Sequence, residues 1–171
     1  MDRLSADAEE LTGQIESMPY INLPLAAQRL FGGRHFHSPG TVTVEGDWSN
    51  GAFFLAADAL GCHLTIQGLN DQSTQGDRAI LELLPLLKTE NPIISAADIP
   101  DLIPILSVVA ACNHGATFTN IRRLRLKESD RVSSIISMIE CLGGCAWATE
   151  DTLTVSGVPL TGGTVDSMND H

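Results

Sequence analysis

The amino-acid sequence predicts a mixed α/β fold. Stretches with the apolar spacing of helices alternate with short β-branched stretches that are typical of strands, and one helix–strand–helix unit recurs. Glycine closely follows four of the five expected helices, and glycine ends helices readily. The expected helices cover residues 20–31, 49–60, 77–88, 101–113 and 129–142.

The expected strands lie between and after these helices. Near the end of the chain, residues 145–149 and 152–156 flank the dipeptide Glu150-Asp151, and a two-residue connection is typical of a β-hairpin. Three further strands are expected from their β-branched residues and alternation: 41–44, 63–66 and 116–119.

An internal repeat supports this organisation. Residues 59–68 resemble residues 112–120, and each segment is followed by an Asp-Arg pair that opens a helix. These pairs, Asp77-Arg78 and Asp130-Arg131, are 53 residues apart. A repeated unit implies a pseudo-symmetric domain in which neighbouring units bury each other's apolar faces. Chance similarity between two amphipathic helices is the alternative.

Composition excludes several classes of function. The chain has 171 residues and a net charge of −11, which argues against binding to nucleic acid or to an anionic membrane surface. Its longest apolar run, residues 102–112, is well short of the roughly 20 residues that cross a bilayer. The polar, acidic start lacks the apolar segment of a secretory signal, so a cytoplasmic location is expected.

The four cysteines form no CxxC pair and have no histidine at zinc-finger spacing. Neither a structural metal nor a disulfide framework is therefore expected. The interpretation is that they are buried, small apolar residues: Cys62, Cys112, Cys141 and Cys145.

Half of the chain's ten cations fall in one ten-residue window, at Arg122, Arg123, Arg125, Lys127 and Arg131. In an acidic protein this concentration points to a small polyanion as the ligand. If a helix begins near Glu128, Lys127 and Arg131 share a face at its N-terminus, where backbone N–H groups also attract phosphate or carboxylate. The alternative is a solvated charged face with Glu128 and Asp130 as local ion-pair partners.

Asp101 precedes a strongly apolar segment that is expected to form a helix. Its simplest role is the N-cap, since an Asp side chain accepts hydrogen bonds from the first-turn N–H groups. Near the cation window it could instead act as a general base toward a bound hydroxyl. The residues alone leave both roles open.

The segment 126–131, Leu-Lys-Glu-Ser-Asp-Arg, resembles a signature of the 5-enolpyruvylshikimate-3-phosphate synthase family. Further segments follow in that family's order and span nearly the whole chain. They are residues 17–20, 38–40, 44–49, 75–77, 99–101 and 169–171. A related enolpyruvyl transferase, which acts on UDP-N-acetylglucosamine, shares the fold and chemistry but is not similar in these motifs.

The resemblance implies a substrate-binding set for shikimate-3-phosphate. Ser17, Tyr20 and Lys127 match positions that contact this substrate in the family. Arg123 stands where the family usually has a contacting asparagine, so that contact departs from the pattern. Arg131 matches an arginine that binds the anionic groups of phosphoenolpyruvate.

The resemblance also implies the acid/base groups. Asp101 matches the carboxylate that handles the proton of the attacking 5-hydroxyl, and Glu128 matches the acid that transfers a proton at the methylene of phosphoenolpyruvate. His171 matches the histidine of a closing motif. The implied reaction adds the hydroxyl to C2 of phosphoenolpyruvate and then expels phosphate, so two acid/base groups act in opposite senses. This scheme requires neither a metal nor an organic cofactor.

The implied fold is an inside-out α/β barrel, also called an α-β prism, built from βαβαββ-type repeats. Residues 1–44 would be the tail of one globular domain and residues 45–171 most of the other. The chain lacks the family's first half and its C-terminal residues after His171. It is also short at residues 31–38 and 88–97, where the family normally continues into a β-hairpin.

The implied activity is enolpyruvyl transfer to shikimate-3-phosphate in aromatic amino-acid biosynthesis. The alternatives are a non-catalytic fragment or binding module of the same fold, and a transferase for UDP-N-acetylglucosamine. Because the resemblance supplies only one side of the substrate enclosure, the isolated chain is expected not to turn over substrate. The oligomeric state is left open.

Overall fold

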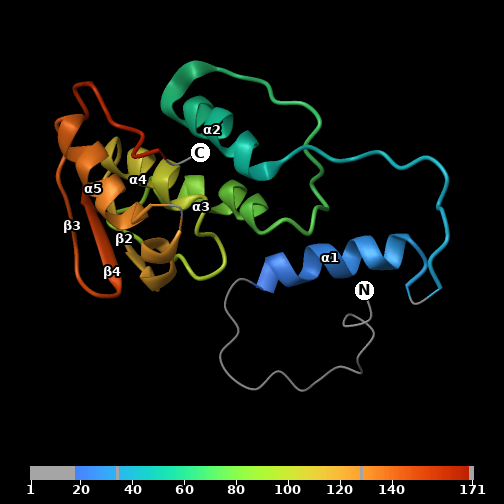
Figure 1. Ribbon diagram of the computed structural model, residues 1–171. Helices are drawn as coiled ribbons and strands as arrows, with labels where there is room; N and C mark the ends of the chain where they lie inside the picture. Colours follow the sequence, from blue (N-terminus) through green and yellow to red (C-terminus); the bar gives the residue numbers. More distant parts are fainter. Residues whose placement is uncertain (1–17, 34, 128, 170–171) are drawn as a thin grey trace.

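The computed structural model describes residues 18–33, 35–127 and 129–169. It confirms the mixed α/β class, with helices and a small four-stranded sheet (Figure 1). The helices are α1 (Met18–Leu30), α2 (Trp48–Ala57), α3 (Ile80–Leu86), α4 (Ile103–Ala111) and α5 (Arg131–Cys141). Short helical turns flank them: η1 (Asp58–Cys62), η2 (Gly76–Ala79) and η3 (Arg122–Leu126).

The sheet has the order β1-β2-β4-β3, with β1 parallel to β2 and the other pairs antiparallel. Its strands are β1 (Ile93–Ser95), β2 (Gly115–Thr119), β3 (Ala146–Ala148) and β4 (Thr152–Ser156). The expected strand 116–119 and the expected C-terminal hairpin are thus confirmed. The pairing aligns Ile93, Thr117, Thr154 and Trp147 in one row across the sheet.

The hydrophobic core lies between the sheet and helices α4 and α5, which cover one of its faces. Helix α4 is apolar on nearly all sides and is central to this core, with Leu106 and Val109 almost fully buried. Phe118 and Leu153 point from the sheet into the same core. The only polar side chain of α4, Ser107, donates its hydroxyl proton to the carbonyl of Ile103, so its burial leaves no unsatisfied group.

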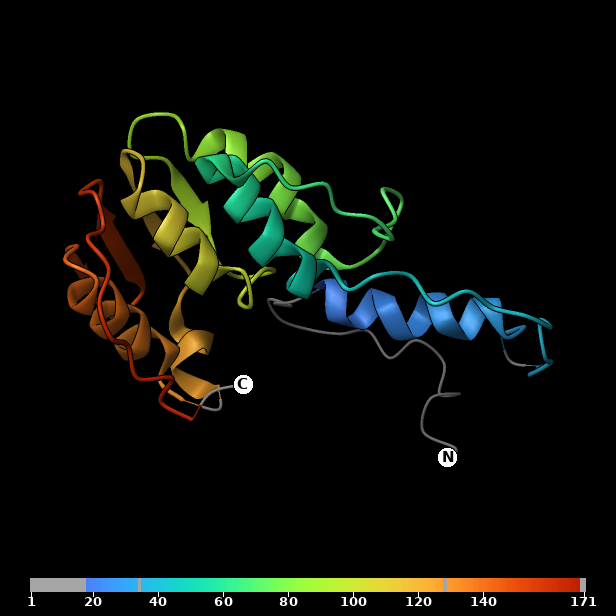
Figure 2. The ribbon, with the colours of Figure 1, turned by 90° about the horizontal axis from the view of Figure 1, so that it is seen from above.

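Helix α1 lies to one side of this body. Figure 2 shows it beyond α2 and α3, on the side away from the sheet. None of its residues is buried. Hydrogen bonds hold its first turn: the Met18 N–H donates to Asp98 at 3.1 Å, and the Tyr20 hydroxyl donates to Asp101. The N-terminal end of α1 is therefore the part that joins the rest of the molecule.

Two expected strands are wrong: residues 41–44 and 63–66 belong to no sheet. An extended segment becomes a strand only when a neighbouring backbone pairs with it. The two segments are joined near their ends by one backbone hydrogen bond among the described residues, from the Gly46 N–H to the Gly68 carbonyl at 2.9 Å. Conversely, β1 was not expected, and it forms because residues 93–95 pair with β2.

The cysteine interpretation is also wrong, because all four cysteines are free and exposed. They lie at or just after the ends of helical segments or in the loop before β3, where side chains leave the core. The residues concerned are Cys62, Cys112, Cys141 and Cys145.

The structure reproduces part of the expected repeat. Each unit places a glycine with positive φ near the end of its first helical region: Gly61 at 102° lies in η1, and Gly115 at 83° follows α4. Each extended segment also ends near a left-handed residue, Gly68 or Asn120. The difference is that the second segment pairs as β2, whereas the first does not pair.

Candidate functional site

The carboxylate of Asp101 brings together side chains from three other parts of the chain. It accepts hydrogen bonds from the Tyr20 hydroxyl, from Lys127 Nζ at 3.3 Å and from an Arg131 guanidinium nitrogen at 2.5 Å. The Arg131 side chain is 13% exposed and that of Asp101 is 27% exposed. Lys127 Nζ also lies 5.9 Å from the centre of the Tyr20 ring, within the range of a cation–π contact.

Asp101 is not the N-cap of α4, as its simplest role required. Leu102 occupies the cap position and makes no side-chain cap bond. Backbone bonds fix the preceding turn, from Ile99 N–H to Ala96 and from Leu102 N–H to Ile99, and Leu102 is fully buried. The Asp101 carboxylate is therefore directed at the cations instead of at its own helix.

Lys127 and Arg131 lie beside Asp101 for a different structural reason from the one expected. Helix α5 begins at Arg131 and not near Glu128, so Lys127 lies before the helix, immediately after η3. Asp130 is the N-cap, and its side chain accepts from the N–H groups of Val132 and Ser133. Lys127 and Arg131 thus converge because both bind Asp101, and not because they share a helical face.

A cavity of about 480 Å³ opens beside this cluster. Its size suits a small organic ligand. Asp101, Lys127 and Arg131 line it together with apolar and small polar side chains of α2, α4 and α5 and the segment 165–167. Those other lining residues are Ser49, Asn50, Phe53, Pro104, Ser134, Ile135, Met138, Val165, Asp166 and Ser167.

Electrostatics at Asp101 favour its ionised form. Burial acts against ionisation, but hydrogen bonds from Tyr20 and Arg131 and the charge of Lys127 outweigh it and hold the pKa of Asp101 below its ordinary value. Burial, and then the hydrogen bond to Asp101, raise the pKa of the Tyr20 phenol. Tyr20 therefore stays protonated at neutral pH and donates a hydrogen bond to Asp101.

We expect ionised Asp101 to stabilise the chain at neutral pH and to lose this contribution in acid. Because its folded-state pKa lies below its ordinary value of 3.8, the contribution is complete above that value and disappears as pH falls through the folded-state pKa. In urea unfolding, the unmodified chain should lose roughly 1.5–3 kcal/mol more than Asp101→Asn between pH 7 and strong acid. Parallel pH profiles for the two proteins would contradict this expectation.

Sequence reasoning assigned no role to Asp77, which the structure places close to this site. Its side chain is nearly buried and accepts a hydrogen bond from the Ser49 hydroxyl at 2.5 Å. Burial raises the pKa of Asp77, although the Ser49 bond opposes the shift. Asp77 borders a second cavity of about 420 Å³ that Tyr20 and Ser49 also line. The available signal was the family-like segment 75–77, which contains Asp77.

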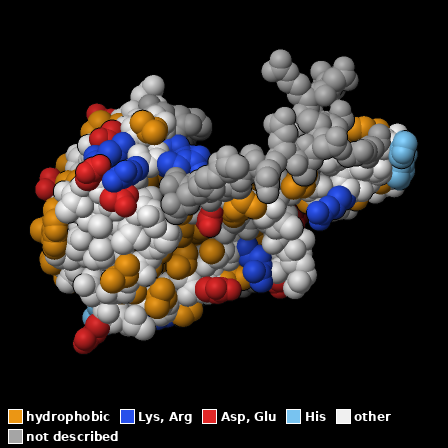
Figure 3. Space-filling view, turned by 90° about the horizontal axis from the view of Figure 1, so that it is seen from below, with side chains coloured by type: hydrophobic (Ala, Val, Ile, Leu, Met, Phe, Trp, Pro, Cys, Tyr) orange, Lys and Arg blue, Asp and Glu red, His pale blue; other side chains and the backbone are white. Residues whose placement is uncertain are grey.

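The remaining cations of the window do not line the main cavity. Arg122 pairs with Glu150 at 3.1 Å and has a side chain that is 68% exposed. Arg125 pairs with Asp130 at 3.4 Å, and Arg123 is exposed. At the upper left of the face in Figure 3, Lys and Arg side chains lie beside Asp and Glu side chains. The solvated-face interpretation, with Asp130 as an ion-pair partner, therefore holds for part of the window.

Three expected site residues, Ser17, Glu128 and His171, lie outside the described residues. Within residues 18–33, 35–127 and 129–169, no three His, Cys, Asp or Glu side chains form a group that could hold a metal ion. No helix among those residues is both long and apolar enough to cross a membrane.

Two cations at the wall of a cavity of this size, Lys127 and Arg131, provide charge-assisted hydrogen-bond donors for a small anionic ligand. Comparison with known proteins identifies the family to which this candidate anion-binding site belongs. Residues 27–171 match the family model described as EPSP synthase (3-phosphoshikimate 1-carboxyvinyltransferase). The chain belongs to the EPSP synthase family.

Curated relatives agree with this family. The chain is 33% identical to the 3-phosphoshikimate 1-carboxyvinyltransferase of Methanospirillum hungatei, over 94% of the chain and 46% of the relative. It is 34% identical to that of Clostridium kluyveri, over 98% of the chain and 47% of the relative, and 35% identical to that of Clostridium acetobutylicum, over 94% and 45%. The chain therefore spans slightly less than half the length of these relatives.

The first of these alignments runs over 199 residues, which is more than the 171 residues of the chain. The relative therefore has residues within the aligned region that this chain lacks. This agrees with the expectation that the chain is shortened internally.

Proposed function

We propose that this chain forms part of an enzyme that transfers the enolpyruvyl group of phosphoenolpyruvate to the 5-hydroxyl of shikimate-3-phosphate. The observation that carries the proposal is the Asp101 cluster, in which one carboxylate binds Tyr20, Lys127 and Arg131 at the edge of a cavity. Three of these four residues also line that cavity. The identity of the two substrates is inferred from membership of the family.

Asp101, Lys127 and Arg131 form an internal ion cluster in which an anionic substrate can replace Asp101. A phosphate or carboxylate bound by Lys127 and Arg131 takes the place of Asp101 as their counter-ion. The pKa of Asp101 then rises, because it loses the contacts that favour its ionised form. A carboxylate released in this way is a better base for the substrate hydroxyl than one held between two cations.

The reaction then follows with balanced proton transfers. The 5-hydroxyl oxygen bonds to C2 of phosphoenolpyruvate, its proton goes to Asp101, and C3 gains a proton from an acid. A C3 proton then returns to that acid, the bond from C2 to the phosphate oxygen breaks, and the departing phosphate takes up the proton held by Asp101, which leaves the enol ether and phosphate. In this proposal Glu128 is the acid at C3, Arg131 binds phosphoenolpyruvate, and Ser17, Tyr20 and Lys127 bind shikimate-3-phosphate. Arg123 and His171 keep only the roles that the resemblance implied.

We also infer that the complete protein forms the inside-out α/β barrel, with residues 1–44 in one domain and residues 45–171 in the other. The separate position of α1, which has no buried residue, supports a boundary after it. The recurrence of a helix, a positive-φ glycine and an extended segment supports a repeated unit.

Calorimetry tests the proposed substrate. Shikimate-3-phosphate is titrated into the 171-residue chain, alone and together with the N-terminal half of a full-length relative, with UDP-N-acetylglucosamine as the control ligand. We expect shikimate-3-phosphate to bind at least tenfold more tightly in the mixture, because the second half encloses the ligand and excludes water. Absence of binding in both samples, or preference for the control ligand, would contradict the proposal.

A further inference from the structure

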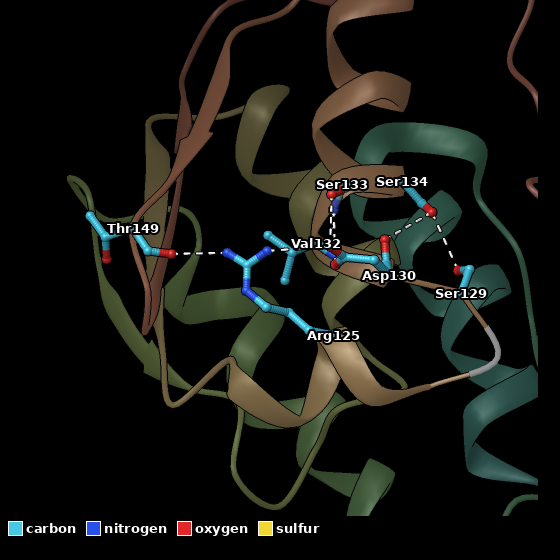
Figure 4. Close-up of polar contacts among 7 residues, drawn as sticks. All are labelled: Arg125, Ser129, Asp130, Val132, Ser133, Ser134 and Thr149. Carbon is cyan, nitrogen blue, oxygen red and sulfur yellow. Dashed lines mark hydrogen bonds and ion pairs between the residues drawn. The ribbon is translucent and has the colours of Figure 1, made fainter.

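Arg125 connects two segments that are distant in sequence. It lies in η3, and its guanidinium donates to the backbone carbonyl of Thr149 at 2.9 Å and pairs with Asp130 at 3.4 Å (Figure 4). Thr149 follows β3 in the turn of the hairpin, and Asp130 is the N-cap of α5. One side chain thus joins the hairpin turn to the start of a helix.

Asp130 in turn organises the first turn of α5. One of its carboxylate oxygens accepts from Val132 N–H at 3.1 Å and Ser133 N–H at 3.3 Å, and the other accepts from the Ser133 hydroxyl at 2.8 Å. The Ser134 hydroxyl donates to the Asp130 carbonyl at 3.1 Å. Arg131 directly follows Asp130 in the chain, so any movement of this cap also moves the backbone that carries the Arg131 side chain.

We propose that Arg125 is a positioning residue of the site, which fixes the N-cap of α5 to the β3–β4 turn and so holds Arg131 against Asp101. Its importance for substrate binding rests on the proposed function. The positioning itself is a property of this chain and can be measured without substrate.

Geometry distinguishes Arg125 from the other arginine at the same turn. Arg122 binds Glu150, and these side chains are 68% and 84% exposed, so their ion pair contributes little. The Arg125 side chain is 35% exposed and one of its acceptors is a backbone carbonyl, which cannot turn away as a side chain can. A guanidinium offers donors in two directions at once, whereas the ammonium of a lysine is a single point charge.

The test compares Arg125→Met and Arg125→Lys with the matched control Arg122→Met in the 171-residue chain. Nuclear magnetic resonance measures amide exchange at Val132 and Ser133 and the titration of the Asp101 carboxyl. In the Arg125→Met chain we expect exchange at these two amides to quicken roughly tenfold relative to amides of α4. We also expect Asp101 to titrate at a higher pH, since Arg131 holds it less firmly while Tyr20, Lys127 and Asp77 still face it.

Arg125→Lys keeps the charge but cannot bridge both acceptors, so it should change both readouts in the same direction and by less. Its smaller change also protects the test if the methionine variant does not fold. Unchanged exchange and titration in the Arg125 variants, or equal changes in Arg122→Met, would overturn the proposal. If the unmodified chain and the mixture bind no shikimate-3-phosphate, the proposed function fails, but these two readouts still decide whether Arg125 positions Arg131.

Discussion

Replacing Arg131 by alanine is expected to weaken binding of phosphoenolpyruvate by roughly 10- to 150-fold. This range corresponds to the loss of one hydrogen bond to a charged group. The side chain of Arg131 is only 13% exposed and lines the cavity, so bulk water screens its charge weakly. In Arg131→Ala, a bound carboxylate or phosphate therefore loses a positive counter-charge and the hydrogen-bond donors of the guanidinium.

Arg122→Ala is the matched control for this substitution. It removes the same charge from the same window, but Arg122 pairs with Glu150 at the surface and does not line the cavity. Calorimetry with phosphoenolpyruvate, on the chain mixed with the N-terminal half of a full-length relative, should show less than a twofold effect for this control. Small and equal losses for the two variants would mean that the window acts as a general positive field and contains no site.

The elements that could be predicted from sequence are those that local information determines. Helices at 20–31 and 101–113 follow from apolar spacing, and the hairpin at 145–156 follows from its two-residue turn. Strands at 41–44 and 63–66 failed because β-branched residues favour extended backbone but do not supply a partner. Strand β1 was not predicted for the converse reason: its three residues form a strand because they pair with β2, which is more than 20 residues away.

The same distinction applies to the site. The cation window is visible in the sequence, but the contact from Tyr20 to Asp101 joins residues that are 81 positions apart. Spacing carries no information on such a contact, and only resemblance to the family placed the two residues in one site. The convergence of Lys127 and Arg131 was expected, but on a shared helical face. Helix α5 begins only at Arg131, so the two residues share no helical face, and their hydrogen bonds to a third residue, Asp101, bring them together.

Asp101→Asn is expected to change anion binding and turnover in opposite directions. Asp101 is the internal counter-ion of Lys127 and Arg131 and competes with any bound phosphate for them. Removing its charge should therefore tighten binding of inorganic phosphate to the 171-residue chain by roughly tenfold at low salt. The amide cannot accept the hydroxyl proton as a carboxylate does, so turnover by the mixture with the N-terminal half and the C-terminal residues of a full-length relative should fall roughly 100- to 10,000-fold.

Asp166→Asn is the control with the same change of charge in the same cavity. Asp166 lines the cavity, but its carboxylate accepts from the Met168 N–H and forms no described ion pair with Lys127 or Arg131. It should therefore alter phosphate binding by less than about twofold. If Asp101→Asn weakens phosphate binding together with turnover, Asp101 holds the two cations in place instead of competing for them. If both aspartate variants tighten binding equally, the gain reflects net charge, and the replacement of Asp101 by substrate is wrong.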